Sequence, residues 1–268
     1  MNRRELLQRS AAAGLMAAIP FSLGAKEVST AGEGTAAVSN DANPAQSVLP
    51  PNPLKPPASG SIQVAFPISK GTIDMDFFGP WVIFGSVFIP GRETFDTYTV
   101  AETKTALATQ MGLNIIPDHT FETAPKPRII VIPAQVGATD VMLQWIRKSS
   151  ESADLTMSIC DGAKVLARTG LLDGKNATEH HDEFENFATE FPKVHLIRGV
   201  RFVEDGSNLA TSAGLSSGID LSLRVVERYF GREMAEKTAY FLEYQGKGWL
   251  DPNSNSIYAG TSHIEAKP

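Results

Sequence analysis

The chain has 268 residues, of which 42% are hydrophobic and 20% are charged, so most of it has the composition of a packed globular protein. Its formal net charge is -6. Proteins that bind nucleic acid or anionic membranes generally present a basic face, so this charge balance argues against both classes.

The first 25 residues have the pattern of an export signal. Arg3 and Arg4 precede an apolar run over 11–23, which is too short to cross a bilayer as a helix but suits the hydrophobic region of a signal peptide. Paired arginines resemble a twin-arginine signal, which exports folded proteins. We expect a signal over 1–25, cleavage near Ala25, a periplasmic or secreted location and no stable membrane anchor after cleavage.

Residues 26–60 are rich in alanine, serine, glycine and proline and poor in large apolar side chains. This composition favours extended backbone without a core and predicts a disordered linker. The folded domain is expected over 61–268, with its core ending near residue 250 and a short C-terminal tail.

Strand-like and helix-like segments then alternate along the chain. The β-branched run 128–132 is typical of a strand buried on both faces, and Asp205-Gly206 is a strong hairpin signal. Pro80 is compatible with a helix if it lies in the first turn. The predicted strands are 62–66, 97–101, 114–121, 128–132, 154–159, 200–204 and 208–211, and the predicted helices are 75–87, 139–150, 161–169, 183–190 (a polar helix), 219–230 and 233–244. The alternation predicts a doubly wound α/β fold, with a mostly parallel sheet sandwiched by helices.

Cys160 is the only cysteine, so no internal disulfide can form. It directly follows a predicted buried strand and precedes Asp161, Gly162 and a helix, which is the pattern of a nucleophile elbow. Gly162 lacks a side chain where the helix passes a neighbouring strand. The helix N-terminus is expected to lower the pKa of the thiol. These features favour a functional thiol over a buried inert one.

The run 158–180 resembles the C-x-G-x-x-x-L-A-x-x-G-L-L-x-G-x-x-A-T-x-H stretch of the ThiJ/PfpI superfamily. It is most similar to the branch of isonitrile hydratases and the sensor domains of AraC-type regulators. The segments 75–80, 201–206, 211–214 and 218–221 continue the pattern in order. The resemblance covers about 61–250 and implies a class I glutamine-amidotransferase-like, flavodoxin-like fold, often a homodimer.

The resemblance also implies roles for individual residues. Asp76 corresponds to an acid that reaches the cysteine sulfur and exchanges a proton with the thiol or the substrate. The alternative is a carboxylate stabilised by the helix dipole alone. His180 matches the A-T-x-H histidine. It either orients a group near the thiol or is a core histidine with a purely structural role. Backbone N–H groups of Asp161 and Gly137 are candidates for an oxyanion hole.

Two departures from the family pattern bear on activity. Asp161 stands where peptidase-like members have a histidine after the cysteine, which argues against a peptidase. The loop 133–137 reads Pro-Ala-Gln-Val-Gly instead of containing Pro-Gly-Gly, so a reshaped oxyanion site is expected. His180 and His181 would need further metal ligands that the sequence does not reveal. We expect neither a metal nor a cofactor.

The sequence therefore predicts an exported cysteine-dependent enzyme that acts on a small electrophile, similar to an isonitrile hydratase. Glyoxalase-like and hydrolytic activities remain open. The alternative is a non-catalytic ligand-binding or redox-sensing module. Little chain follows the resembling region, so a regulator's DNA-binding part is not expected. The expected partner is a small molecule rather than nucleic acid.

Overall fold

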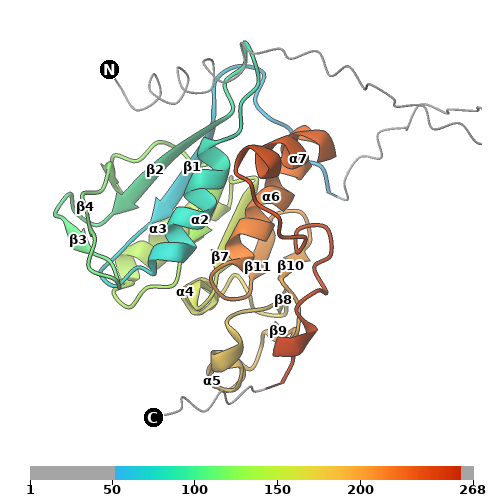
Figure 1. Ribbon diagram of the computed structural model, residues 1–268. Helices are drawn as coiled ribbons and strands as arrows, with labels where there is room; N and C mark the ends of the chain where they lie inside the picture. Colours follow the sequence, from blue (N-terminus) through green and yellow to red (C-terminus); the bar gives the residue numbers. More distant parts are fainter. Residues whose placement is uncertain (1–51, 261–268) are drawn as a thin grey trace, which may run out of the picture. The chain divides into compact units, whose positions relative to one another are not determined.

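A seven-stranded sheet forms the centre of the domain (Figure 1). The computed structural model describes residues 52–260, so the predicted signal and most of the predicted linker lie outside the described residues. The strand order is β10-β11-β7-β6-β1-β2-β5, and every pair is parallel except β10 with β11. The strands are β1 (Ile62–Pro67), β2 (Phe95–Ala101), β5 (His119–Thr120), β6 (Ile129–Ile132), β7 (Leu155–Ile159), β10 (Phe202–Asp205) and β11 (Leu209–Ser212). The mostly parallel α/β fold predicted from the sequence is confirmed.

Helices cover both faces of this sheet (Figure 1). The helices are α2 (Asp74–Gly85), α3 (Asp140–Ser150), α4 (Gly162–Arg168), α5 (Phe184–Glu190), α6 (Ser217–Phe230) and α7 (Arg232–Phe241). Ile129 and Val131 of β6 pack in the cluster formed with α2, α6 and α7, whereas Ile130 and Ile132 pack with α3 and α4. Alternate side chains of a strand point to opposite faces, so a continuous apolar run is required in a strand buried on both sides.

The predicted strand 114–121 is wrong. Its two ends form separate short strands, β4 (Asn114–Ile115), which pairs antiparallel with β3 (Leu107–Ala108), and β5, which pairs with β2. Pro117 lies between them and has no N–H to donate to a ladder, so it separates the two strands. Two further short strands, β8 (Asn176–Ala177) and β9 (His195–Leu196), were not predicted.

Two predicted helices differ in detail. Pro80 lies in the interior of α2 rather than in its first turn. A proline there cannot donate to the carbonyl four residues earlier, which belongs to Asp76. The predicted polar helix is amphipathic: the short 3-10 helix η1 (His181–Glu183) leads into α5, which buries Phe184 and Phe187.

The end of the predicted linker is attached to the domain. The N–H of Leu54 donates to the carbonyl of Arg228 at 2.8 Å, and the buried Arg228 guanidinium donates to the carbonyl of Asn52 at 2.8 Å. Extended backbone forms no hydrogen bonds within itself, and here its N–H and carbonyl groups form hydrogen bonds with Arg228 of α6. Within 52–260, no helix is long and apolar enough to cross a membrane.

Replacement of Gly162 by alanine is expected to destabilise the fold. A Cβ at this position would overlap the carbonyl oxygen of Ile132 at the end of β6, and overpacking of this kind costs about 1–3 kcal/mol. Urea unfolding measures the difference. The matched control is Gly85→Ala at the end of α2, where a Cβ would meet nothing within 4 Å. Equal stability of the two variants would contradict the close packing of α4 against the end of β6.

Candidate functional site

The strand order reverses between β1 and β6, because the chain proceeds from β1 outward to β2 and later from β6 to β7 on the other side. Ligands in open α/β sheets bind at such a switch point, beyond the carboxyl ends of the strands. Asp76 follows β1, Ala134 follows β6 and Cys160 follows β7. The sheet therefore brings together residues that are far apart in the sequence.

Cys160 forms the predicted elbow. Its φ is 57°, a left-handed conformation that is uncommon and strained for a residue with a side chain. Its N–H lies 3.2 Å from the carbonyl oxygens of both Ser212 and Ala213, at the end of β11. Gly162 then lets α4 begin directly against Ile132. The side chain of Cys160 is buried, with 7% of the residue exposed.

Asp76 is fully buried, and one of its oxygens, Oδ2, accepts a hydrogen bond from the N–H of Ala134 at 3.1 Å. The carbonyl of Ala134 in turn accepts from the N–H of Ile73, so this peptide holds the start of α2 on both sides. The other oxygen, Oδ1, has no hydrogen-bond partner within 52–260. Burial raises the pKa of Asp76 to about 8, with the Asp161 charge adding to it and contacts with Ala134, Cys160 and Leu215 opposing it. The carboxyl group therefore holds its proton at neutral pH.

The expected lowering of the thiol pKa is wrong. Burial raises the pKa of Cys160, and the neighbouring carboxyl groups of Asp76 and Asp161 raise it further. The N–H groups of Asp161 and Leu215 face the sulfur and act in the opposite direction, but burial outweighs them. α4 contains only seven residues, and its N-terminus does not offset the loss of water around the sulfur.

Leu215 lies in the candidate site, and the sequence analysis did not select it. Its N–H lies near both the Cys160 sulfur and the Asp76 carboxyl group, because Leu215 has a φ of 48° in the loop after β11. Backbone groups of this kind leave no signature in the residue type. Together with the N–H of Asp161, the N–H of Leu215 is placed where it could stabilise negative charge at the sulfur or on a bound substrate.

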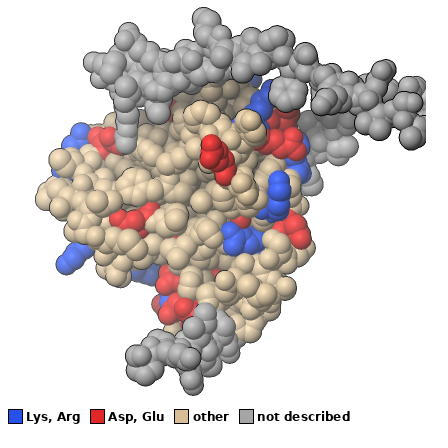
Figure 2. Space-filling model, viewed as in Figure 1, with Lys and Arg blue, Asp and Glu red and all other residues tan. Residues whose placement is uncertain are grey.

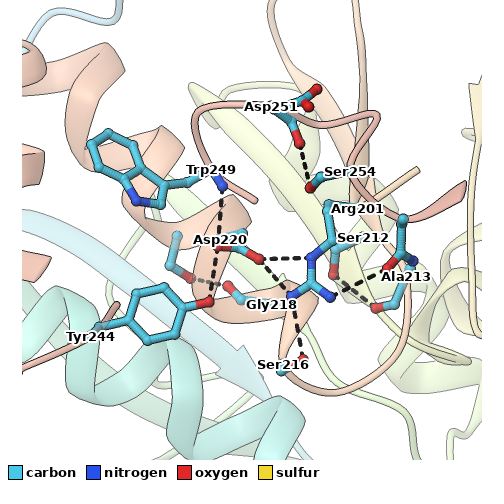
Figure 3. A network of polar contacts seen from close by, with 12 residues as sticks. Arg201, Ser212, Ala213, Ser216, Gly218, Asp220, Tyr244, Trp249, Asp251 and Ser254 are labelled. Carbon is cyan, nitrogen blue, oxygen red and sulfur yellow. Dashed lines mark hydrogen bonds and ion pairs between the residues drawn. The ribbon is translucent and has the colours of Figure 1, made fainter. Parts of the chain in front are cut away.

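A network around Asp220 fixes this loop (Figure 3). Asp220 is buried on α6 and accepts from Arg201 Nε at 2.8 Å, from the Tyr244 hydroxyl at 2.9 Å and from the Trp249 N–H at 3.1 Å. Arg201 also forms hydrogen bonds with residues before and after Leu215. Its carbonyl accepts from the N–H of Ala213 at 2.9 Å, and its Nη2 donates to the Ser216 hydroxyl at 3.3 Å. The network thereby holds the left-handed residue in place.

Gly137 is not available in the role expected for it. Its N–H donates to the carbonyl of Lys70 at 3.2 Å, and it packs closely against Ser69. Neither Ala134 nor Gln135 has a positive φ, and the Gln135 amide donates to the carbonyls of Pro67 at 3.1 Å and Pro133 at 3.2 Å.

His180 lies against the loop that carries Leu215. A Cβ on Gly214 would overlap the His180 ring, so this glycine is required by the close approach. His180 Nδ1 accepts from the N–H of Asp182 at 3.3 Å. His180 therefore lies beside the loop that faces Cys160, and within residues 52–260 no hydrogen bond joins its ring to the thiol.

Glu179 is a second buried acid that the sequence analysis did not select. It is fully buried, and neither carboxyl oxygen has a hydrogen-bond partner in the described part of the chain. Burial, followed by the charge of Asp161, raises the pKa of Glu179 to about 9. Its place beside His180 in the motif is the only signal that the sequence contains for it.

Comparison with known proteins identifies the family of this chain. A model of the DJ-1/PfpI family matches residues 62–228, more than half of the chain. The chain belongs to the DJ-1/PfpI family. The isonitrile hydratase of Pseudomonas putida is 28% identical over 192 residues, covering 69% of this chain and 79% of that enzyme. The HTH-type transcriptional regulator CdhR of Pseudomonas aeruginosa is 30% identical over 128 residues, which make up 46% of this chain and 38% of the regulator.

Solved structures show the same fold. A ThiJ/PfpI family protein from Pseudomonas syringae superposes with a TM-score of 0.62 at 26% identity, covering 76% of this chain and 84% of that one. An AraC family transcriptional regulator from Pseudomonas putida matches with a TM-score of 0.60 at 15% identity, covering 67% and 98% of the two chains. The family of this DJ-1/PfpI chain therefore includes both an enzyme and regulators, and the resemblance inferred from the motifs is confirmed.

Asp76→Asn is expected to flatten the dependence of unfolding free energy on pH. The folded pKa of Asp76, about 8, lies above the ordinary value of 3.8, so its stabilising contribution is fully present below the ordinary pKa and is lost as the pH rises through the folded pKa. One proton corresponds to about 1.4 kcal/mol per pH unit, the upper limit for the extra slope of the wild type. Urea unfolding between about pH 5 and pH 8 measures it.

Asp140→Asn controls for the loss of a carboxylate from the first turn of a helix, since Asp140 is exposed at the start of α3. Parallel stability curves for the wild type and Asp76→Asn would show that the buried carboxyl group does not hold a proton in this range.

Proposed function

We propose that this DJ-1/PfpI protein is a cysteine-dependent enzyme that adds water to a small electrophile of the isonitrile type. The observation that carries the proposal is the pairing of Cys160, on its strained elbow, with the buried Asp76, whose pKa is raised to about 8. The relationship to the Pseudomonas putida isonitrile hydratase supports this choice of substrate class.

The terminal carbon of an isonitrile accepts a proton and a nucleophile in turn. In the proposed reaction, protonated Asp76 donates its proton to that carbon, the Cys160 sulfur forms a bond to it, and the thiol proton passes to the Asp76 carboxylate. The product is a thioimidate, R–N=CH–S-Cys. Water then adds to the same carbon, the nitrogen gains a proton, and the C–S bond breaks to release R–NH–CHO and the free thiol. One water molecule is consumed, and no oxidant or reductant is needed.

The protonation states suit this sequence of steps. An acid acts best when its pKa lies near the working pH, and a carboxyl group with a pKa of about 8 retains its proton at neutrality. The thiol also remains protonated, because burial raises its pKa. Sulfur attack coupled to proton transfer avoids forming an isolated thiolate in this buried site. The N–H groups of Asp161 and Leu215 then stabilise charge that develops near the sulfur.

Turnover of a simple alkyl isonitrile tests the proposal, with formamide formation as the readout. The wild type is expected to convert the isonitrile, and Cys160→Ala is expected to fall to the uncatalysed rate because no thioimidate can form. Asp76→Asn is expected to lose about 10²- to 10⁴-fold in kcat, the usual contribution of a general acid. Asp140→Asn, which removes an exposed first-turn acid, is expected to retain wild-type turnover.

Turnover by Cys160→Ala at the wild-type rate would contradict covalent catalysis. If the wild type binds the isonitrile calorimetrically but forms no formamide, the hydratase function is wrong and a ligand-binding module replaces it. The second function has its own support, since regulators occur among the relatives.

We also propose that two copies associate through α2. Met75, Phe78 and Val82 are 47%, 37% and 46% exposed, and their spacing places them along one side of the helix. Figure 2 shows that the middle of the face on which α2 lies is largely uncharged, with charged side chains scattered around it. Exposed apolar surface of this kind commonly marks a protein interface.

Val82→Glu is expected to shift a wild-type dimer to monomer in size-exclusion chromatography with light scattering, because a carboxylate would be buried in the interface without a partner. The matched control is Val141→Glu on α3, where the valine is 47% exposed. A monomeric wild type, or equal masses for both variants, would contradict association through α2.

A further inference from the structure

Three consecutive side chains, those of His180, His181 and Asp182, converge at the start of η1. Nδ1 of His180 lies 3.7 Å from Oδ2 of Asp182, and Nε2 of His181 lies 3.2 Å from Oδ1 of the same carboxylate. All three candidate ligand atoms lie within 4.8 Å of one another. Zinc binds histidine nitrogen and carboxylate oxygen at about 2.0–2.2 Å in tetrahedral geometry, which separates neighbouring ligand atoms by about 3.4 Å. The two distances, 3.7 Å to Oδ2 and 3.2 Å to Oδ1, lie close to that value, with each imidazole nearest a different oxygen of the carboxylate.

The local backbone explains why adjacent residues can meet in this way. His180 is extended, with φ -64° and ψ 134°, and the chain turns into η1 directly after it. The backbone N–H of Asp182 donates to His180 Nδ1 at 3.3 Å, so the lone pair of Nδ1 is directed toward this N–H, while the Asp182 carboxylate lies 3.7 Å away. A neutral imidazole with a lone pair at Nδ1 has the tautomer required of a metal ligand. This long hydrogen bond would be exchanged for the bond to the metal.

Both rings contact other parts of the fold. The His181 ring stacks on Tyr258 of the 3-10 helix η2 (Ser256–Tyr258), with centroids 4.6 Å apart. The His180 ring packs against Gly214 and lies 4.5 Å from the His181 ring. The ligands are therefore oriented by contacts 34 or more residues away in the sequence rather than by their own turn alone.

The site is also accessible to water. The His180 and His181 side chains are 22% and 19% exposed, and Asp182 is 59% exposed. A metal held by three protein ligands keeps a position for water or another ligand when it faces solvent. The sequence alone offered only two histidines, and the carboxylate supplies the third group.

We propose that His180, His181 and Asp182 bind one divalent transition-metal ion, for which zinc is the best match. Two imidazoles and one carboxylate suit zinc, cobalt and nickel. Magnesium and calcium prefer sites made of oxygen ligands, so they are poor matches. Because His180 packs against Gly214, next to Leu215, the ion would brace one side of the loop that faces Cys160.

Metal titration of the full chain, after removal of bound metal with a chelator, tests this site. Calorimetry is expected to show one Zn²⁺ bound per chain, and Co²⁺ is expected to give the visible absorption of a four- or five-coordinate ion. His181→Phe preserves a ring against Tyr258 but removes a ligand, and Asp182→Asn removes the charged ligand with little change in shape. Each is expected to weaken Zn²⁺ binding by on the order of 100-fold, since loss of outer-shell partners alone costs about 10–100-fold.

Two further variants separate this site from other sources of binding. His195→Phe removes an exposed histidine from β9, and Cys160→Ala removes the only thiol; both are expected to bind Zn²⁺ as the wild type does. Zn²⁺ should also raise the melting temperature of the wild type but not of Asp182→Asn, which is compared with the wild type without metal to confirm that it folds. The proposal is overturned if the wild type binds neither ion, if His181→Phe and Asp182→Asn bind as the wild type does, or if Cys160→Ala abolishes binding.

Discussion

The left-handed turn at Cys160 is the constraint on which the rest of the site depends. The backbone of Cys160 keeps its φ of 57° because its N–H approaches two carbonyls at the end of β11 and because Gly162 brings α4 directly against Ile132. These contacts come from strands on both sides of β7. The neighbouring strands therefore hold the strain, and the sulfur emerges at the point where α2, the β6 loop and the β11 loop meet.

Burial determines the chemistry available at this point. Removal of Asp76 and Cys160 from water disfavours their charged forms and raises the pKa of each group. Both groups therefore keep their protons at a higher pH than exposed groups of the same type. Glu179 experiences the same effect, with Asp161 as a shared charged neighbour. The site consequently combines a neutral nucleophile with a proton donor, which differs from the thiolate that an elbow at a helix N-terminus suggests in isolation. Backbone N–H groups provide the compensating polarity.

The C-terminal part of the domain contributes to the site by holding the loop that carries Leu215. Asp220 accepts hydrogen bonds from Arg201, Tyr244 and Trp249 (Figure 3). Arg201 in turn forms hydrogen bonds with Ala213 and Ser216, which flank the segment Gly214-Leu215. His180 packs on the same loop from another direction. The position of one backbone N–H thus results from a buried ion pair, a close ring contact and a helix, each encoded in a different part of the chain.

From its local patterns, the sequence predicted the α/β class, the central strands, the hairpin at Asp205-Gly206 and the elbow at Cys160, because these depend on continuous apolar runs, on turn residues and on a strand followed directly by a helix. It also selected Asp76 through its place in a family motif. Four features depend instead on how distant segments pack together: the direction of the thiol pKa shift, the use of the Gly137 N–H by Lys70, the place of the Leu215 N–H and the approach of Asp182 to two histidines. The physical reason is that burial and hydrogen bonding depend on which distant segments surround a group, and residue type does not record them.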